Sequence, residues 1–143
     1  MIEHKKREMV KKVIWIFTII AIMLIIGLVA IILSNPLRRS SEQIRADILE
    51  ITPIGMSMED VLNIIEDNDQ WEIRRVSYDF GFYKQAPNER PRTVGEKSIT
   101  VRKGHYRSIL MEIIVIDVFW GFDENSQLID IWVWKAGLMR TSL

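Results

Sequence analysis

The stretch of sequence that decides the fold is EIIVIDVFWGFDENSQLIDIWVWK, residues 112–135. Two runs rich in β-branched and aromatic residues, 112–122 and 127–135, flank the segment DENS at 123–126, whose residue types favour turns. Within each run, apolar residues recur at every second position, as in a strand with one buried face. The sequence therefore predicts a β-hairpin.

The first face of this hairpin is expected to be wholly apolar. Centring the turn on Glu124 and Asn125 fixes which residues of the two strands lie opposite one another. Because such a face must be covered, we expect it to pack against helices. The predicted pairs on this face are Trp120 with Ile129, Val118 with Ile131, and Ile116 with Val133.

The second face of the hairpin is a candidate binding interface. Trp-containing apolar patches interrupted by charge are frequent at protein interfaces. An alternative is that the aromatic-rich segment 79–97 folds over this face and buries it, and the sequence leaves both readings open. The interface residues, in their predicted pairs, are Phe119 with Asp130, Asp117 with Trp132, and Val115 with Trp134.

Two short helices are predicted upstream of the hairpin. Residues 41–51 place apolar side chains three to four positions apart, and Ser40 with Gln43 has the form of a capping box. A second helix is expected to follow Ser57, whose hydroxyl suits an N-cap, with Asp60 in its first turn. Both helices have one apolar face, so both can pack on the sheet.

Two further strands are expected between the helices and the hairpin. Residues 71–80 alternate in polarity, with a change of phase at 74–75 that predicts a bulge. Residues 98–103 alternate again, and Gly104 is expected to end that strand. The intervening segment 79–97, rich in Pro, Gly and charge, is predicted to be a long loop without regular structure. The predicted fold class is α+β, with two short helices on a three- to four-stranded antiparallel sheet in the order ααβββ.

The N-terminal part of the chain is predicted to be a transmembrane anchor. VIWIFTIIAIMLIIGLVAIIL, residues 13–33, carries no charge and would span about 30 Å as a helix, which matches a bilayer core. The run is longer than the apolar region of about 7 to 15 residues in a cleavable signal peptide, so we expect an uncleaved anchor. Five Lys and Arg residues precede it against three shortly after it, which favours a cytoplasmic N-terminus.

These observations predict a single-pass protein of the plasma membrane with its C-terminal domain outside. The expected partners are the lipid bilayer, through the anchor, and a protein of the cell envelope. The predicted organisation is a cytoplasmic tail at 1–12, a transmembrane helix at 13–33, a linker at 34–40, an extracytoplasmic α+β domain at 41–137 and a tail at 138–143.

The composition excludes several classes of site. The chain has no cysteine, so it can form neither disulfides nor thiolate metal sites, and its zero net charge gives no footprint for nucleic acid. Asp123 and Asn125 echo the start of a calcium-binding EF-hand loop, but position 12 of that loop would be Trp134 instead of Glu. We therefore predict no catalytic residues, no metal and no cofactor.

The order of elements resembles a known family. The turn 54–57 (IGMS), the helix opening 58–61 (MEDV) and the hairpin around 122–125 (FDEN) are similar to motifs of the SmpA/OmlA (BamE-like) class of outer-membrane assembly lipoproteins. The resemblance covers residues 41–135, and it implies helices before an antiparallel sheet and a role in binding proteins. This chain departs from that class in its transmembrane anchor, its lack of a lipobox cysteine and Ser126 in place of a turn glycine. It is closer to small single-span proteins of Gram-positive bacteria with a similar exported domain.

Three functions are compatible with this sequence. The first is a tethered binding or scaffold module of the cell envelope without catalysis, which needs an exposed Trp132 and Trp134. The second is a ligand-sensing or enzymatic envelope domain, which needs a pocket lined by Asp117 or Asp130. The third is a small membrane subunit recognised through its anchor, although residues 13–33 contain no pair of small residues at the four-residue spacing typical of helix association.

Overall fold

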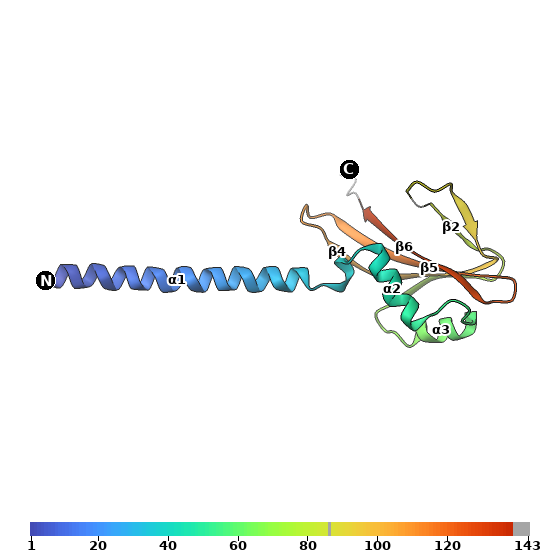
Figure 1. Cartoon of the computed structure of the whole chain (residues 1–143), viewed down its shortest axis with the longest axis horizontal. Coiled ribbons are helices and arrows are strands. Elements are labelled where there is room, and N and C mark those ends of the chain that lie inside the picture. Colours follow the sequence, from blue (N-terminus) through green and yellow to red (C-terminus); the bar gives the residue numbers. More distant parts are fainter. Residues whose placement is uncertain (86, 139–143) are drawn as a thin grey trace. The chain divides into compact units, whose positions relative to one another are not determined.

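A computed structural model describes residues 1–85 and 87–138 of the chain (Figure 1). It divides into two compact units, Met1–Arg38 and the part that begins at Arg39, and each is described by itself. The boundary lies inside the predicted linker 34–40. Of the predicted tail 138–143, Leu138 is the last residue of a strand, and residues 139–143 lie outside the described residues.

The first unit is one long helix, α1 (Ile2–Leu33), followed by a 3-10 turn, η1 (Pro36–Arg38). The helix is long and apolar enough to cross a membrane, and all its side chains are exposed. It includes the basic residues of the predicted tail 1–12, so the apolar run and its charged flank form one continuous helix. The Thr18 hydroxyl donates to the Ile14 carbonyl at 2.9 Å, which satisfies that hydroxyl within an apolar surface.

The second unit begins with the two predicted helices, α2 (Ser41–Ile51) and α3 (Met58–Glu66). The predicted capping box is confirmed, because the Gln43 N–H donates to Ser40 Oγ at 3.2 Å and the Ser40 N–H donates to Gln43 Oε1 at 3.1 Å. The Ser57 hydroxyl likewise accepts the Asp60 N–H at 3.1 Å. Both helix starts are therefore fixed by local side chains.

The helices are followed by a four-stranded antiparallel sheet in the order β1-β4-β5-β6, which confirms the α+β fold class. The predicted bulge near Arg74 is present, since the β1–β4 register shifts between Ile73 and Arg75. The strands are β1 (Glu72–Ser77), β4 (Lys97–Arg107), β5 (Ile113–Phe122) and β6 (Leu128–Leu138).

The prediction that Gly104 ends its strand is wrong. A register shift between Arg102 and Gly104 places a bulge there, and pairing with β5 continues to Arg107 opposite Ile113. A glycine in a strand can mark a bulge as readily as an end, because its backbone tolerates the local distortion.

The β5–β6 hairpin forms as predicted, but the predicted register is wrong by two residues. The Asp123 N–H donates to the Gln127 carbonyl, and Ser126 adopts a left-handed backbone (φ 62°), which makes the turn longer than one centred on Glu124 and Asn125. A bulge after Gly121 adds a further residue. The observed pairs are Trp120 with Ile131, Val118 with Val133, Ile116 with Lys135, Phe119 with Trp132, Asp117 with Trp134, Val115 with Ala136, and Gly121 with Asp130.

Because the shift is even, the predicted residues from Asp130 to Trp134 keep their faces. The prediction for Ile129 is wrong: it lies in the bulge without a partner in the register and is 44% exposed, and Leu128 is buried instead. The first face packs on α2 and α3 (Figure 1) and forms the core, in which Trp120 is the largest fully buried side chain. The Trp120 indole N–H donates to Thr52 Oγ1 at 3.1 Å, which ties β5 to the end of α2. The fully buried side chains around it include Ile44, Ile48, Val61, Ile65, Ile116, Val118, Phe122 and Ile131.

The segment 79–97 is not an irregular loop, so that prediction is wrong. It contains a two-stranded antiparallel ribbon, β2 (Phe82–Lys84) paired with β3 (Arg92–Val94), which lies apart from the helices at the other side of the sheet (Figure 1). Strands of three residues are too short to show an alternating pattern. The ribbon is anchored on the four-stranded sheet by Phe82 and Val94, which are both buried.

Candidate functional site

The second face of the hairpin carries a chain of aromatic side chains that we call the aromatic face. It consists of Phe119, Trp132 and Trp134, with Phe82 of the ribbon packed on it. Ring centroids are 5.2 Å apart for Phe119 and Trp132, and 6.4 Å apart for Trp132 and Trp134. Phe82 lies 5.6 Å from Phe119 and 6.2 Å from Trp132. These distances are typical of aromatic side chains in contact.

Gly121 creates the space in which Phe82 sits. A Cβ atom at Gly121 would lie 2.8 Å from Cε1 of the Phe82 ring and 3.2 Å from Val94 Cγ1. The missing side chain on β5 therefore lets the ribbon dock against the sheet. A small residue within an otherwise bulky strand was the sequence signal for this contact.

The ribbon covers only part of the aromatic face. Phe82 is 4% exposed, whereas Trp134 is 45% and Tyr83 is 59% exposed. The burial that the sequence left open as an alternative thus holds for the Phe82 end of the face, and the Trp134 end is exposed, as a binding interface would require. Phe119 and Trp132 lie between them and are half-buried.

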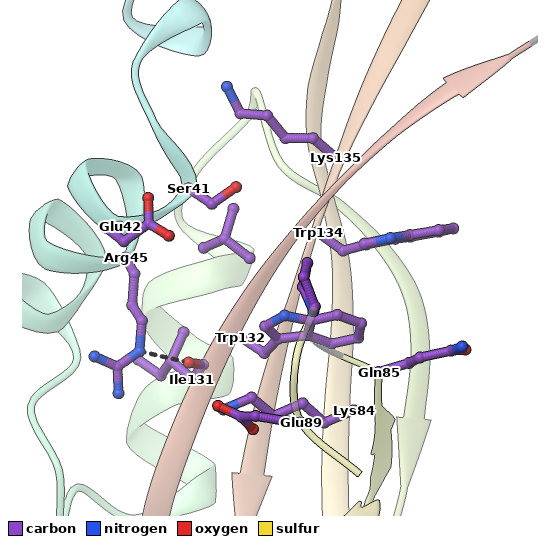
Figure 2. A pocket seen from close by; sticks show the side chains of 12 residues that line it. Ser41, Glu42, Arg45, Lys84, Gln85, Glu89, Ile131, Trp132, Trp134 and Lys135 are labelled. Carbon is purple, nitrogen blue, oxygen red and sulfur yellow. Dashed lines mark hydrogen bonds between the residues drawn. The ribbon is translucent and has the colours of Figure 1, made fainter. Parts of the chain in front are cut away.

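Two adjoining hollows open beside the exposed end. The first, which we call the edge hollow, has a volume of about 460 Å³ and lies between α2, β6 and the residues Lys84, Gln85, Pro87 and Glu89 (Figure 2). The second has a volume of about 450 Å³ and is lined mainly by aromatic side chains, including Tyr83 and Phe119. The hollows share the lining residues Gln85, Pro87, Trp132 and Trp134.

Asp130 joins the three elements that surround the edge hollow. Its carboxylate accepts from Arg45 Nη2 of α2 at 3.0 Å and from Lys84 Nζ of β2 at 3.3 Å. Arg45 also donates through Nε to the Ile131 carbonyl at 2.6 Å, a bond drawn in Figure 2. Asp130 and Lys84 are largely buried, so this network holds α2, the ribbon and β6 together.

Asp117 belongs to a separate ion pair. Arg102 donates to its two carboxylate oxygens at 2.9 and 3.2 Å, and this hydrogen-bonded pairing raises the pKa of the Arg102 guanidinium. Each of the two candidate carboxylates is thus committed to its own cations, and Asp117 lies opposite Trp134 whereas Asp130 lies opposite Gly121. Neither carboxylate lines the two hollows, so these hollows are not the carboxylate-lined pocket that the second function needs.

Lys135 lies at the far end of the edge hollow. Its ammonium donates to the Arg39 carbonyl and lies 5.4 Å from the centroid of the Tyr106 ring. Burial lowers the pKa of the Lys135 ammonium, and the Glu42 carboxylate opposes that shift. Charged groups thus border the hollow at both ends, with the two tryptophans between them.

The structure brings together four of the six predicted interface residues around the hollows and leaves two apart. Phe119, Trp132 and Trp134 line the hollows, and Asp130 accepts a hydrogen bond from the lining residue Arg45. Val115 is only 4% exposed, so its side chain is not available to a partner, and Asp117 is held by Arg102. Sequence reasoning missed Arg45, Lys84, Gln85 and Tyr83, which come from a helix surface and a ribbon far from the hairpin in sequence.

Within residues 1–85 and 87–138, no three His, Asp or Glu side chains lie close enough together to hold a metal ion. The polar groups that border the hollows are side chains suited to hydrogen bonding and ion pairing. The arrangement can therefore bind a ligand through aromatic stacking with polar contacts at the rim. Comparison of the chain with models of protein families, with curated proteins and with solved structures finds no match.

Proposed function

We propose that the chain is a membrane-anchored interaction module of the cell envelope that binds another protein through the open end of the aromatic face. The observation that carries this proposal is the exposure of Trp134 (45%) beside Trp132 and Phe119 in open hollows. Tryptophans at the centre of a concave surface frequently contribute most of the energy of a protein interface. The resemblance to the SmpA/OmlA class supports the same kind of role.

The proposed location is the plasma membrane, with α1 as the anchor and the second unit on the outer side. The support is an apolar helix with five basic residues before its uncharged run and three shortly after it. A helix of this type needs no further partner to satisfy its backbone in lipid.

The absence of cysteine makes the orientation directly measurable. Single cysteines introduced as Asn125→Cys and Lys6→Cys, both at exposed positions, would be the only thiols in the chain. In intact cells, a membrane-impermeant maleimide is expected to label the first variant, and the second only after the membrane is permeabilised. Labelling of Lys6→Cys in intact cells with protection of Asn125→Cys would reverse the proposed orientation.

The binding proposal is tested by photocrosslinking in cells. A photoreactive amino acid in place of Trp134 is expected to give a discrete protein adduct, because this position lies at the proposed contact. The matched control is the same group at Ile129, which lies on the same strand and is 44% exposed but lines neither of the two hollows.

The adduct formed at Trp134 is expected to disappear when Phe119 is also changed to alanine, since Phe119 supports Trp132 at 5.2 Å. Equal adducts from positions 134 and 129 would mean that the labelling reports exposure alone. That result, or no adduct from position 134, would overturn the binding proposal.

A further inference from the structure

Strand β6 forms one edge of the sheet, and part of its backbone faces the edge hollow. The Ile131 N–H donates to Asp130 Oδ1 at 2.8 Å, and the Ile131 carbonyl accepts from Arg45 at 2.6 Å, so both groups point away from β5. Register is unbroken from Asp130 to Leu138. Because backbone direction alternates along an antiparallel strand, the N–H and C=O of Val133 also point outward.

The edge hollow lies along this outward backbone. Its lining includes Ile131 and Val133 from one face of β6, and Trp132 and Trp134 from the other. Residues of both faces can border one hollow only where it follows the edge of the strand, as Figure 2 shows. Among the described residues, the outward polar groups of Val133 make no hydrogen bond with the rest of the chain, and Val133, only 4% exposed as a whole because its side chain lies in the core, lines the hollow.

The two edges of the sheet differ in how they are protected. At the opposite edge, β1 carries Glu72, Arg74 and Arg75 together with a bulge, which are features that prevent another strand from pairing. In β6, the run Ile-Trp-Val-Trp at 131–134 has no charge and no bulge. Arg45 and Asp130 form hydrogen bonds with the main chain of Ile131, but they do not reach the main chain of Val133.

We propose that this edge receives an extended segment of a partner protein as an added β-strand. This inference rests on the proposed function and specifies the partner's form: the segment bonds to the main chain of Val133 and places apolar side chains on the tryptophans. Alternate residues of a strand lie about 6.6 to 6.8 Å apart. The rings of Trp132 and Trp134 are 6.4 Å apart, so residues i and i+2 of the segment can each contact one ring.

The shape of the hollow favours a single strand over a second copy of this chain. The edge is flanked on one side by α2 through Ser41, Glu42 and Arg45. On the other side it is flanked by Lys84, Gln85, Pro87 and Glu89. A second copy would bring its own helix and ribbon to the same place. Two edges flanked in this way cannot approach to the spacing of about 4.8 Å that neighbouring strands need.

The test uses the full chain in lipid nanodiscs and a phage-displayed library of random peptides long enough to span the strand. We expect enriched peptides with apolar residues at alternate positions. Their binding is expected to slow hydrogen exchange of the Val133 amide. N-methylation of one alternate set of peptide residues should weaken binding about fivefold to tenfold for each bond lost, and methylation of the other set should not.

A second variant changes the protein backbone without altering a side chain. An ester in place of the amide at Val133 removes its N–H and retains the buried isopropyl group. It also makes the Trp132 carbonyl, which faces β5, a weaker hydrogen-bond acceptor, so the urea stability of the variant is measured beside its binding. Peptide binding is expected to weaken about fivefold, with far-UV circular dichroism of the protein unchanged. The matched comparison is Trp134→Ala, which removes an aromatic contact and leaves the main chain intact.

The outcomes separate this inference from the proposed function. If peptides bind and depend on Trp134, but neither N-methylation nor the ester matters, strand addition is wrong and the aromatic interface stands. If no peptide is enriched while the Trp134 adduct forms in cells, strand addition is again overturned. If both the peptide and the adduct are absent, the proposed function fails as well.

Discussion

Changing Trp120 to alanine is expected to lower the free energy of unfolding of the second unit by about 4 kcal/mol. The side chain is fully buried, and its ring lies 5.8 Å from that of Trp71. Its removal leaves a cavity between the sheet and the helices and deprives Thr52 Oγ1 of a donor. Since small domains have total stabilities of about 5 to 15 kcal/mol, the loss removes a large part of the total.

The measurement is a urea titration of the full chain in detergent, followed by far-UV circular dichroism, in which α1 contributes a constant helical signal. Trp120→Phe separates the two contributions, because it keeps most of the ring volume but loses the hydrogen bond to Thr52, and we expect a cost of about 1 to 2 kcal/mol. Trp134→Ala is the exposed control and is expected to cost less than about 1 kcal/mol. Equal losses for Trp120→Ala and Trp134→Ala would contradict the assignment of the core.

The sequence predicted the elements whose signals are local. Ser40 with Gln43, and Ser57 with Asp60, fix the helix starts through side chains three residues away, so the capping contacts are the same in any tertiary context. The hairpin strands are long and rich in β-branched and aromatic residues, and the turn-forming residues between them are unambiguous. These features explain why the α+β fold was predictable.

The register of the hairpin was not predictable from the same signals. It depends on the left-handed backbone of Ser126 and on a bulge after Gly121, and neither residue type demands these conformations. An error of two residues leaves the faces from Asp130 onward unchanged, so the hydrophobic pattern cannot detect it, and only Ile129 in the bulge changes from its predicted buried face to an exposed position. The pattern therefore identified Trp132 and Trp134 as neighbours of Phe119 on one face without giving their true partners.

The candidate site was half predictable for a related reason. The tryptophans are visible in the sequence, but the walls of the hollows come from α2 and from the ribbon, through Arg45, Lys84 and Tyr83. The positions of Lys84 and Tyr83 depend on the docking of Phe82 over Gly121. Such docking is a tertiary event with no periodic signal.

The ribbon itself depends on a close approach at Gly81, and Gly81→Ala is expected to detach it from the sheet. A Cβ atom at this position would lie 2.1 Å from the Val94 carbonyl oxygen and 2.2 Å from that of Gly95, which are both backbone atoms. Because backbone cannot move aside as a flexible side chain can, we expect a loss of about 3 kcal/mol. Phe82 should then leave its position on Phe119 and Trp132, and Lys84 should leave Asp130.

Two measurements follow the ribbon in this variant. Hydrogen exchange of residues 82–84 and 92–94 is expected to become fast, and the Trp134 adduct should be lost because one wall of the hollow is gone. Gly55→Ala is the matched control, since a Cβ atom there meets no atom within 4 Å. We expect this substitution to lower the free energy of unfolding by about 1 kcal/mol, because alanine is strained in the left-handed backbone conformation of Gly55 (φ +89°). Retention of slow exchange in the ribbon of Gly81→Ala would show that the sheet can shift to admit a methyl group. Retention of the adduct after the ribbon has detached would place the binding surface on the hairpin alone.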